Sequence, residues 1–269
     1  MWRAEETKSG KHRRIKKCGA RRRRVSKESP KMKWETQFYI PAQDEDMNRV
    51  LGAGAIMRLM HECAELHVRE MGPSNESLRE RGQAFLISRF ALDMPHPLSG
   101  FSTVRAVTWG CPCRGYSFNR CYEIWQGEQL AARGKAVMAL IDIRTRHLIR
   151  CENYHPGFTP EPEAELTIAE RFVLPPTAEM TMAGKHTVAY ADCDLNGHLN
   201  NTRYAEMFCG VTDMRGKRVT GISVNYQREA PLGTELSVYK TEENGHLLLR
   251  SLLPDGSVNA EASMTLAPL

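Results

Sequence analysis

The sequence predicts an α+β fold built from two similar halves. Three observations lead to this prediction. Near the start of the chain, apolar residues recur every three or four positions, which is the period of one long helix. Segments in which apolar and polar residues alternate come after it, as is typical of antiparallel strands with one buried face. The same order of one strand, one helix and several strands recurs beyond a proline-rich stretch.

The first half contains the longest predicted helix. A strand is predicted over 34–41 and the helix over 51–72, where Gly72-Pro73 ends it. Four strands are predicted after the helix, over 84–92, 101–109, 117–125 and 136–143. The apolar stripe of the helix consists of Ile56, Leu59, Met60, Cys63, Ala64, His67, Val68 and Met71. We expect His67, as part of this stripe, to be a core residue.

The second half repeats this order on a smaller scale. A strand over 185–190 and a short helix over 200–211 are followed by predicted strands over 221–228, 235–240, 246–253 and 258–266. The intervening residues 153–183 hold five of the 14 prolines and many glutamates, so we interpret them as a linker. The expected units are a first half over 32–152, this linker, and a second half over 184–269.

The positive net charge of the chain belongs to its first residues. The 269 residues carry a formal charge of +5, but residues 1–33 hold 14 Lys/Arg and 3 Asp/Glu, a net charge of +11. The other residues hold 23 Lys/Arg and 29 Asp/Glu, a net charge of −6. Residues 1–31 have few large apolar side chains, so we predict a disordered basic tail.

Two interpretations of the basic tail are open. It is either an arm that binds nucleic acid or another anionic surface, or a dispensable extension that is absent if translation starts at Met32. We favour the extension, because Met32 opens directly onto the first patterned segment, and expect no nucleic-acid partner.

Composition limits the class of protein further. Hydrophobic residues make up 41% of the chain, enough for a core, and no apolar run reaches the ~18 residues that indicate a membrane span. The start of the chain lacks the pattern of a secretory signal, so we expect the eight cysteines to be reduced thiols in a cytoplasmic protein. Cys111 and Cys113 have no histidines at zinc-site spacing, and glycine-rich nucleotide-binding patterns are absent. We therefore expect neither a metal nor a cofactor.

Two eight-residue stretches indicate an internal duplication. Residues 44–51 align with residues 192–199, and two aspartates, one asparagine and one leucine coincide. Each stretch lies between the first predicted strand and the helix of its half. Chance matching is the alternative, because Asp and Asn favour helix starts in any protein. The copies differ at one informative position, where Val50 stands in place of His198.

Asp194, Asn196 and His198 are the candidate catalytic residues. Positions two apart in an extended segment point the same way, so the three side chains are expected to face one pocket at the start of the following helix. Free N–H groups and the helix dipole stabilise negative charge there. A carboxylate, an amide and an imidazole are the groups that acyl-transfer hydrolysis needs. The alternative is that Asp194 and Asn196 only shape a turn, that Asn200 or Asn201 caps the helix, and that His198 is a packed residue.

Two stretches resemble a known family. Residues 192–204 (DCDLNGHLNNTRY) resemble the signature of acyl-acyl carrier protein (acyl-ACP) thioesterases, the plant plastid enzymes and their bacterial relatives. Residues 224–230 (VNYQREA) resemble the later strand motif of that family, and the first half fits its pattern over 51–72, 85–93 and 104–110. The resemblance implies a tandem hot-dog fold, in which each antiparallel sheet wraps around its helix. It also implies that the first half binds the acyl chain and that the second half is catalytic.

The resemblance implies hydrolysis of fatty acyl-ACP thioesters to free fatty acid and holo-ACP, in fatty acid biosynthesis, without a cofactor. By position, Asp194, Asn196 and His198 match the catalytic residues of the family, and Glu229 matches its supporting acidic residue. Plant members have a cysteine where this chain has Ala230, which favours a mechanism centred on Asp194. A thiol mechanism through Cys193 or Cys209 is the alternative.

Further residues are candidates for contact with the substrate. Met57 and Met60 could line an acyl pocket, and Asn200 and Asn201 could contact the substrate beside the catalytic residues. The acyl carrier protein is the expected partner of a monomer or homodimer. The alternatives are an acyl-CoA thioesterase or a dehydratase of the same fold, and a non-catalytic acyl-binding or nucleic-acid-binding protein that uses the basic tail.

Overall fold

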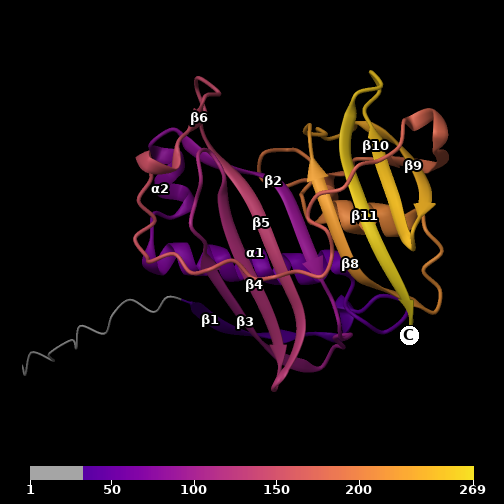
Figure 1. Cartoon of the computed structure of the whole chain (residues 1–269), viewed down its shortest axis with the longest axis horizontal. Helices are drawn as coiled ribbons and strands as arrows, with labels where there is room; N and C mark the ends of the chain where they lie inside the picture. Colours follow the sequence, from indigo (N-terminus) through magenta and orange to yellow (C-terminus); the bar gives the residue numbers. More distant parts are fainter. Residues whose placement is uncertain (1–32) are drawn as a thin grey trace, which may run out of the picture.

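Eleven strands in residues 33–269, the part of the chain that the structure describes, form one antiparallel sheet in this computed structural model. The strand order is β1-β3-β4-β5-β2-β8-β11-β10-β9-β7, and β6 pairs with β5 outside this path. Figure 1 shows the sheet curving around two helices, one in each half. The predicted basic tail, residues 1–31, lies outside the described residues. No helix of the described part is long and apolar enough to cross a membrane.

The first half of the sheet surrounds the long helix α1 (Ala53–Met71), which is followed by the short helix α2 (Asn75–Glu80). Its strands are β1 (Trp34–Ile40), β2 (Gln83–Asp93), β3 (Ser102–Gly110), β4 (Phe118–Gln126), β5 (Gln129–Asp142) and β6 (Leu148–Ile149). Apart from the start of β5, the predicted helix and strands of this half begin and end within about two residues of the predicted bounds. Strand β5 starts seven residues earlier than predicted, because the tight turn at Gly127, with φ of +58°, lets β4 lead directly into it.

The second half surrounds helix α3 (Arg203–Gly210). Its strands are β7 (Thr181–Thr187), β8 (Lys217–Tyr226), β9 (Glu235–Glu243), β10 (His246–Leu252) and β11 (Val258–Pro268). From edge to centre, the first half runs β1-β3-β4-β5-β2 and the second half runs β7-β9-β10-β11-β8. These are the same order of equivalent strands. The tandem hot-dog fold that the resemblance implied is therefore confirmed.

The halves are joined where β2 pairs with β8. Arg89 to Asp93 of β2 pair antiparallel with Asn225 to Gly221 of β8, so the sheet continues across the seam. Apolar side chains from both halves belong to one core cluster, including Phe90 and Met60 from the first half and Phe208, Val224 and Met264 from the second. Because one core spans both halves, we expect them to unfold together.

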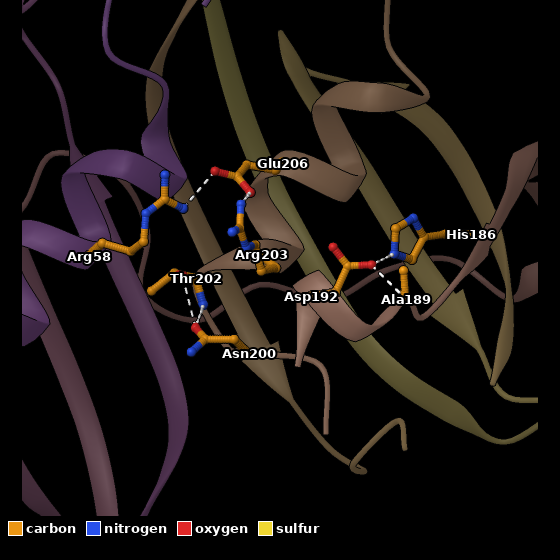
Figure 2. A network of polar contacts seen from close by, with 8 residues as sticks. All are labelled: Arg58, His186, Ala189, Asp192, Asn200, Thr202, Arg203 and Glu206. Carbon is orange, nitrogen blue, oxygen red and sulfur yellow. Dashed lines mark hydrogen bonds and ion pairs between the residues drawn. The ribbon is translucent and has the colours of Figure 1, made fainter. Parts of the chain in front are cut away.

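Helices α1 and α3 approach each other closely at their N-terminal ends. A Cβ atom on Gly54 would lie 2.8 Å from the backbone oxygen of Thr202, so a residue without a side chain is needed there. One turn further along α1, Arg58 forms an ion pair with Glu206 of α3 at 2.6 Å, and Arg203 binds the same carboxylate (Figure 2). The ion pair of Arg58 and Glu206 is partly exposed and therefore adds little stability. The close packing at Gly54 sets the distance between the two helices.

The linker over 153–183 is anchored to the outer face of the sheet, which it crosses from one half to the other (Figure 1). The indole of Trp109 donates to the carbonyl of Pro162 at 2.9 Å, and Asp93 accepts from the backbone N–H of Ile168 at 2.9 Å. Ser223 donates to the carbonyl of Ala169 at 2.8 Å. The last residues of the predicted linker belong to β7, because they pair with β9.

His67 is a core residue, as predicted. Its side chain is fully buried between Trp34 and Phe158, with ring centroids 6.0 and 4.7 Å away. Arg120 lies 2.9 Å from Nδ1, and a guanidinium can only donate, so this nitrogen is the acceptor and the ring is neutral. Burial, together with the positive charge of Arg120, lowers the pKa of His67 from 6.5 to about 4.

This histidine makes stability depend on pH. Between pH 6.5 and about 4 the unfolded chain binds a proton at His67 that the folded chain does not bind. The free energy of unfolding therefore falls as the pH falls through this range, by about 3 kcal/mol from this residue alone. Urea unfolding of the wild type and of His67→Asn at pH 7 and pH 4.5 measures the difference. The free energy of unfolding should change less between the two pH values in the variant than in the wild type. An equal change in both proteins would contradict the role of His67 in the pH dependence.

Candidate active site

The turns before α1 and α3 have the same backbone geometry. Asp46 and Asp194 each accept a hydrogen bond at 2.8 Å, from the backbone N–H of Asn48 and Asn196 respectively. In the first half the N–H of Asp46 donates to the carbonyl of Val50 at 2.9 Å. In the second half the N–H of Asp194 donates to the carbonyl of His198, also at 2.9 Å. The duplicated residues therefore build one turn twice, so the turn alone does not explain His198.

The two asparagines of these turns have different partners. The amide of Asn48 donates to the carbonyls of Met214 and Lys217, at 2.7 and 2.9 Å, and accepts from the N–H of Gly216 at 3.1 Å. The amide of Asn196 donates to Asp194 at 3.2 Å and accepts from Arg79 of α2 at 3.3 Å. Asn48 thus ties the halves together through backbone groups, whereas Asn196 orients a carboxylate.

Glu229 reaches the site through the segment that follows β8. The N–H of Leu199 donates to the carbonyl of Ala230 at 2.9 Å, and this backbone contact brings the preceding residue to His198. Glu229 Oε2 lies 3.4 Å from His198 Nδ1. In the first half the N–H of Leu51 donates to the carbonyl of Leu98 at 2.7 Å, so Pro97 takes the place of Glu229. The first half therefore lacks both the imidazole and the acid beside it.

A pocket of about 400 Å³ contains the predicted catalytic residues. Its lining includes all four of them, Asp194, Asn196, His198 and Glu229, together with Asn200 and Asn201. Six of the eight residues predicted for the site are thus brought together at the start of α3. Tyr204 and Tyr226 also line it, and the hydroxyl of Tyr226 donates to the carbonyl of Asn201 at 2.8 Å.

The pocket lies where β2 and β8 separate. The strands pair up to Arg89 and Asn225; just outside this stretch, residues 85–88 and 226–229 line the two sides of the pocket. At the opposite end of the seam the N–H of Met94 donates to Thr220 at 2.7 Å, and Arg218 donates to the carbonyl of Met94 at 2.7 Å. Hydrogen bonds thus close one end of the seam, and the other end opens into the site.

Sequence reasoning missed the wall that the first half supplies. It consists of His61 of α1, Ala139 of β5 and residues 85–88 of β2. His61 lies beside Phe90 with ring centroids 5.3 Å apart, and its Nε2 atom is buried without a hydrogen-bond partner in the described residues. Burial lowers its pKa from 6.5 to about 4, so the ring is neutral at neutral pH. The signal in the sequence was His61 itself, a polar residue beside the apolar stripe of the helix. The sequence alone does not show that this side of the helix faces the predicted catalytic residues of the second half.

Met57 and Met60 do not reach this pocket. Both are fully buried in the core, and a Cβ on Gly134 of β5 would lie 2.7 Å from the sulfur of Met60. These side chains fill space between α1 and the sheet. Their prediction as substrate-binding residues stays open, and it requires an acyl chain that passes beyond the pocket into the core.

The cysteines that could replace a missing nucleophile lie outside the pocket lining. The thiol of Cys193 lies 3.4 Å from the carbonyl of Ala189 and packs on the core. Burial raises the pKa of the Cys209 thiol to about 12, with smaller effects from Asp46 and Glu206, so its reactive thiolate form is disfavoured. Ala230 is completely buried.

Comparison with known proteins decides the family. Sequence profiles described as the acyl-ACP thioesterase N-terminal domain and C-terminal domain match residues 31–154 and 177–265. The chain belongs to the acyl-ACP thioesterase family. It is therefore an enzyme, a thioester hydrolase that acts on acyl-ACP. No curated protein matches the sequence.

Two solved thioesterases have the same fold. An acyl-ACP thioesterase from Bacteroides thetaiotaomicron VPI-5482 has a TM-score of 0.79 and 19% sequence identity, covering 88% of this chain and 98% of the other. The 12:0-ACP thioesterase from Umbellularia californica has a TM-score of 0.77 and 17% identity, with the same coverage of 88% and 98%. The tandem arrangement of this thioesterase is thus shared over nearly the whole length of both proteins.

Asn200 has a structural role that can be measured apart from substrate binding. Its side-chain oxygen accepts from the N–H and the hydroxyl of Thr202, at 2.9 and 2.8 Å (Figure 2). Thr202 is buried, so Asn200→Ala should destabilise the protein by about 1 to 3 kcal/mol. Asn201→Ala is the matched control, because no described residue accepts from or donates to its side chain. Chemical denaturation measures both, and an Asn200→Ala protein of wild-type stability would contradict the structural role.

Proposed function

We propose that this thioesterase hydrolyses fatty acyl-ACP with Asp194, Asn196, His198 and Glu229 as its catalytic group. The observation that carries the proposal is the contrast between the two copies of the turn. The second copy gathers these side chains in a pocket, and the first copy has Val50 and Pro97 at the equivalent positions. The first copy forms the same turn without an imidazole or a glutamate, so the shape of the turn does not explain His198 and Glu229.

Asp194 is the proposed base. It takes a proton from a water molecule, whose oxygen forms the new bond to the thioester carbonyl carbon. In the alternative route Asp194 attacks that carbon itself and water hydrolyses the acyl-enzyme. One N–H of the Asn196 amide holds Asp194, and the amide has a second N–H that can donate to the oxyanion. The start of α3 adds a positive dipole end beside the same oxygen.

His198 is the proposed proton relay. Asp194 passes the proton that it took from water to the imidazole of His198. When the carbon–sulfur bond breaks, the electron pair goes to sulfur, and the imidazolium gives this proton to sulfur to make the thiol of holo-ACP, which restores neutral His198 and ionised Asp194. Glu229, 3.4 Å from Nδ1, favours the transient imidazolium and keeps the other ring nitrogen directed to the substrate.

The acyl chain is proposed to enter the first half. Phe85, Ile87 and Ala139 form the apolar part of the pocket wall there. The acyl chain would then pass His61. The ring of His61 is neutral, so the free-energy cost of removing water from it is small. Membership of the family supports the carrier protein as the partner, and CoA is the alternative carrier.

One chain contains every group of this proposal, so a monomer could be active, and a homodimer is equally compatible with it. We also propose a cytoplasmic location and a place in fatty acid biosynthesis. The seven described cysteines are free thiols, which fits a reducing compartment.

The catalytic assignment predicts large losses at two positions. Asp194→Asn keeps the hydrogen-bonding shape of the turn and removes the base, and His198→Ala removes the relay. Each should lower kcat/KM about 100-fold or more. Release of free thiol from a panel of acyl-ACPs and acyl-CoAs measures the effect and identifies the preferred carrier and chain.

Asp46→Asn is the matched control for these variants. It makes the same change in the same turn of the first half, where no chemistry is proposed. It should keep nearly all activity. Full activity of folded Asp194→Asn and His198→Ala proteins would remove these residues from the mechanism.

A second prediction concerns thiols. Since Ala230 replaces the cysteine of the plant members and Cys209 has a raised pKa, alkylation with iodoacetamide should leave turnover largely intact. Mass spectrometry would count the modified thiols while activity is followed. Inactivation by one modification per chain, prevented by substrate, would instead favour a cysteine nucleophile.

A further inference from the structure

A second hollow, of about 370 Å³, is lined in part by Arg79, whose guanidinium contacts Asn196 of the pocket. It is lined by Arg79, Glu80, Arg81, Gly82, Ile143 and Arg144, where the end of α2 meets the hairpin between β5 and β6. The carbonyl of Gly82 accepts from the N–H of Ile143 at 2.8 Å, and the N–H of Gly82 donates to the carbonyl of Arg79 at 2.8 Å. Backbone hydrogen bonds therefore hold the two sides of the hollow together.

The hollow is positively charged, although Glu76 interacts electrostatically with Arg79 and Asp142 with Arg144. Three arginines and one glutamate give its lining a net charge of +2. Within residues 33–269 none of Arg79, Arg81 and Arg144 forms an ion pair, although six other arginines do. The nearby carboxylate of Asp142 accepts from the N–H groups of Arg144 and Thr145, at 2.9 Å each, and so serves its own hairpin.

Arg79 connects this hollow to the catalytic group. Its guanidinium donates to Asn196 Oδ1 at 3.3 Å, and the Asn196 amide donates to Asp194 at 3.2 Å. Asn196 is thus the single residue between Asp194 and Arg79 in this chain of hydrogen bonds, and Arg81 and Arg144 line the same hollow as Arg79.

The substrate of this thioesterase carries a negative charge on the carrier side of its thioester. The thioester of ACP or CoA is attached to a pantetheine arm without charge, which ends in a phosphate. Guanidinium groups bind phosphate oxygens with two parallel N–H bonds. Residues 34–269 carry a net charge of −6, so an anionic carrier needs a local positive site to approach them.

We infer that the hollow bordered by Arg79, Arg81 and Arg144 binds the phosphate of the phosphopantetheine arm while the thioester lies in the pocket. This inference rests on the proposed function. Arg79 also orients Asn196, and Arg81 also donates to the carbonyl and the hydroxyl of Ser77, at 3.1 and 3.3 Å. The site recognises what ACP and CoA share, so the carriers are separated by experiment.

The test compares substrates with and without the phosphate. The best acyl chain of the panel is placed on ACP, CoA, phosphopantetheine and pantetheine, and kcat and KM are measured with the full-length enzyme. Wild type should prefer the phosphopantetheine thioester to the pantetheine thioester. Arg81→Gln/Arg144→Gln should raise KM for the phosphorylated substrate about tenfold with little change in kcat, and leave the pantetheine thioester unaffected. Added salt should reduce the preference of the wild type.

The control is Arg215→Gln/Lys217→Gln, which makes the same change in net charge at exposed positions after α3. It should behave like wild type on all four substrates. Losses on the ACP, CoA and phosphopantetheine thioesters alike would support the inference. A loss on ACP alone would assign the arginines to the surface of the carrier protein, a loss on CoA alone would assign them to the nucleotide part of CoA, and either result would overturn it. Equal losses with and without the phosphate, or no preference in wild type, would overturn the inference. No hydrolysis of any thioester by wild type would instead overturn the proposed function.

Discussion

The pairing of β2 with β8 is the interaction on which the rest of this structure depends. It turns two small sheets into one, lets a single core span both halves and fixes the end of the seam at which the strands diverge. The pocket exists because the pairing stops at Arg89 and Asn225, and the turn before α3 and the residues after β8 meet there. A change in this register by one residue would turn the side chains of residues 85–88 and 226–229 to the wrong faces.

The two ends of the seam explain why a duplicated fold has one site. The first copy of the turn joins the two halves, because the amide of Asn48 donates to the backbone carbonyls of Met214 and Lys217 in the second half. Arg218 closes the same end by binding the carbonyl of Met94. The second copy keeps a turn of the same shape and adds the imidazole and carboxylate of His198 and Glu229. The first copy of the turn thus holds the halves together, and the second copy carries the side chains that are candidates for catalysis.

Local features of the chain were predictable where the physical cause is local. The apolar stripe of α1 and the alternation in β11 follow directly from the geometry of helix and strand. The turn at Asp194 closes through hydrogen bonds within five residues, so its shape was visible in the motif. The predicted end of the linker and the predicted start of β5 were less accurate, because these boundaries depend on the pairing of β7 with β9 and of β5 with β4.

The sequence by itself determined that the fold is repeated, that the second copy differs by a histidine, and that Asp194, Asn196 and His198 are candidates for one site. These conclusions needed only spacing and residue type. The tertiary structure decided what faces that site from the other half: His61, the end of β2 and Arg79. It also decided that Met57 and Met60 lie in the core instead of the pocket. Contacts between residues more than 100 positions apart depend on strand register and helix approach, and no local pattern encodes these.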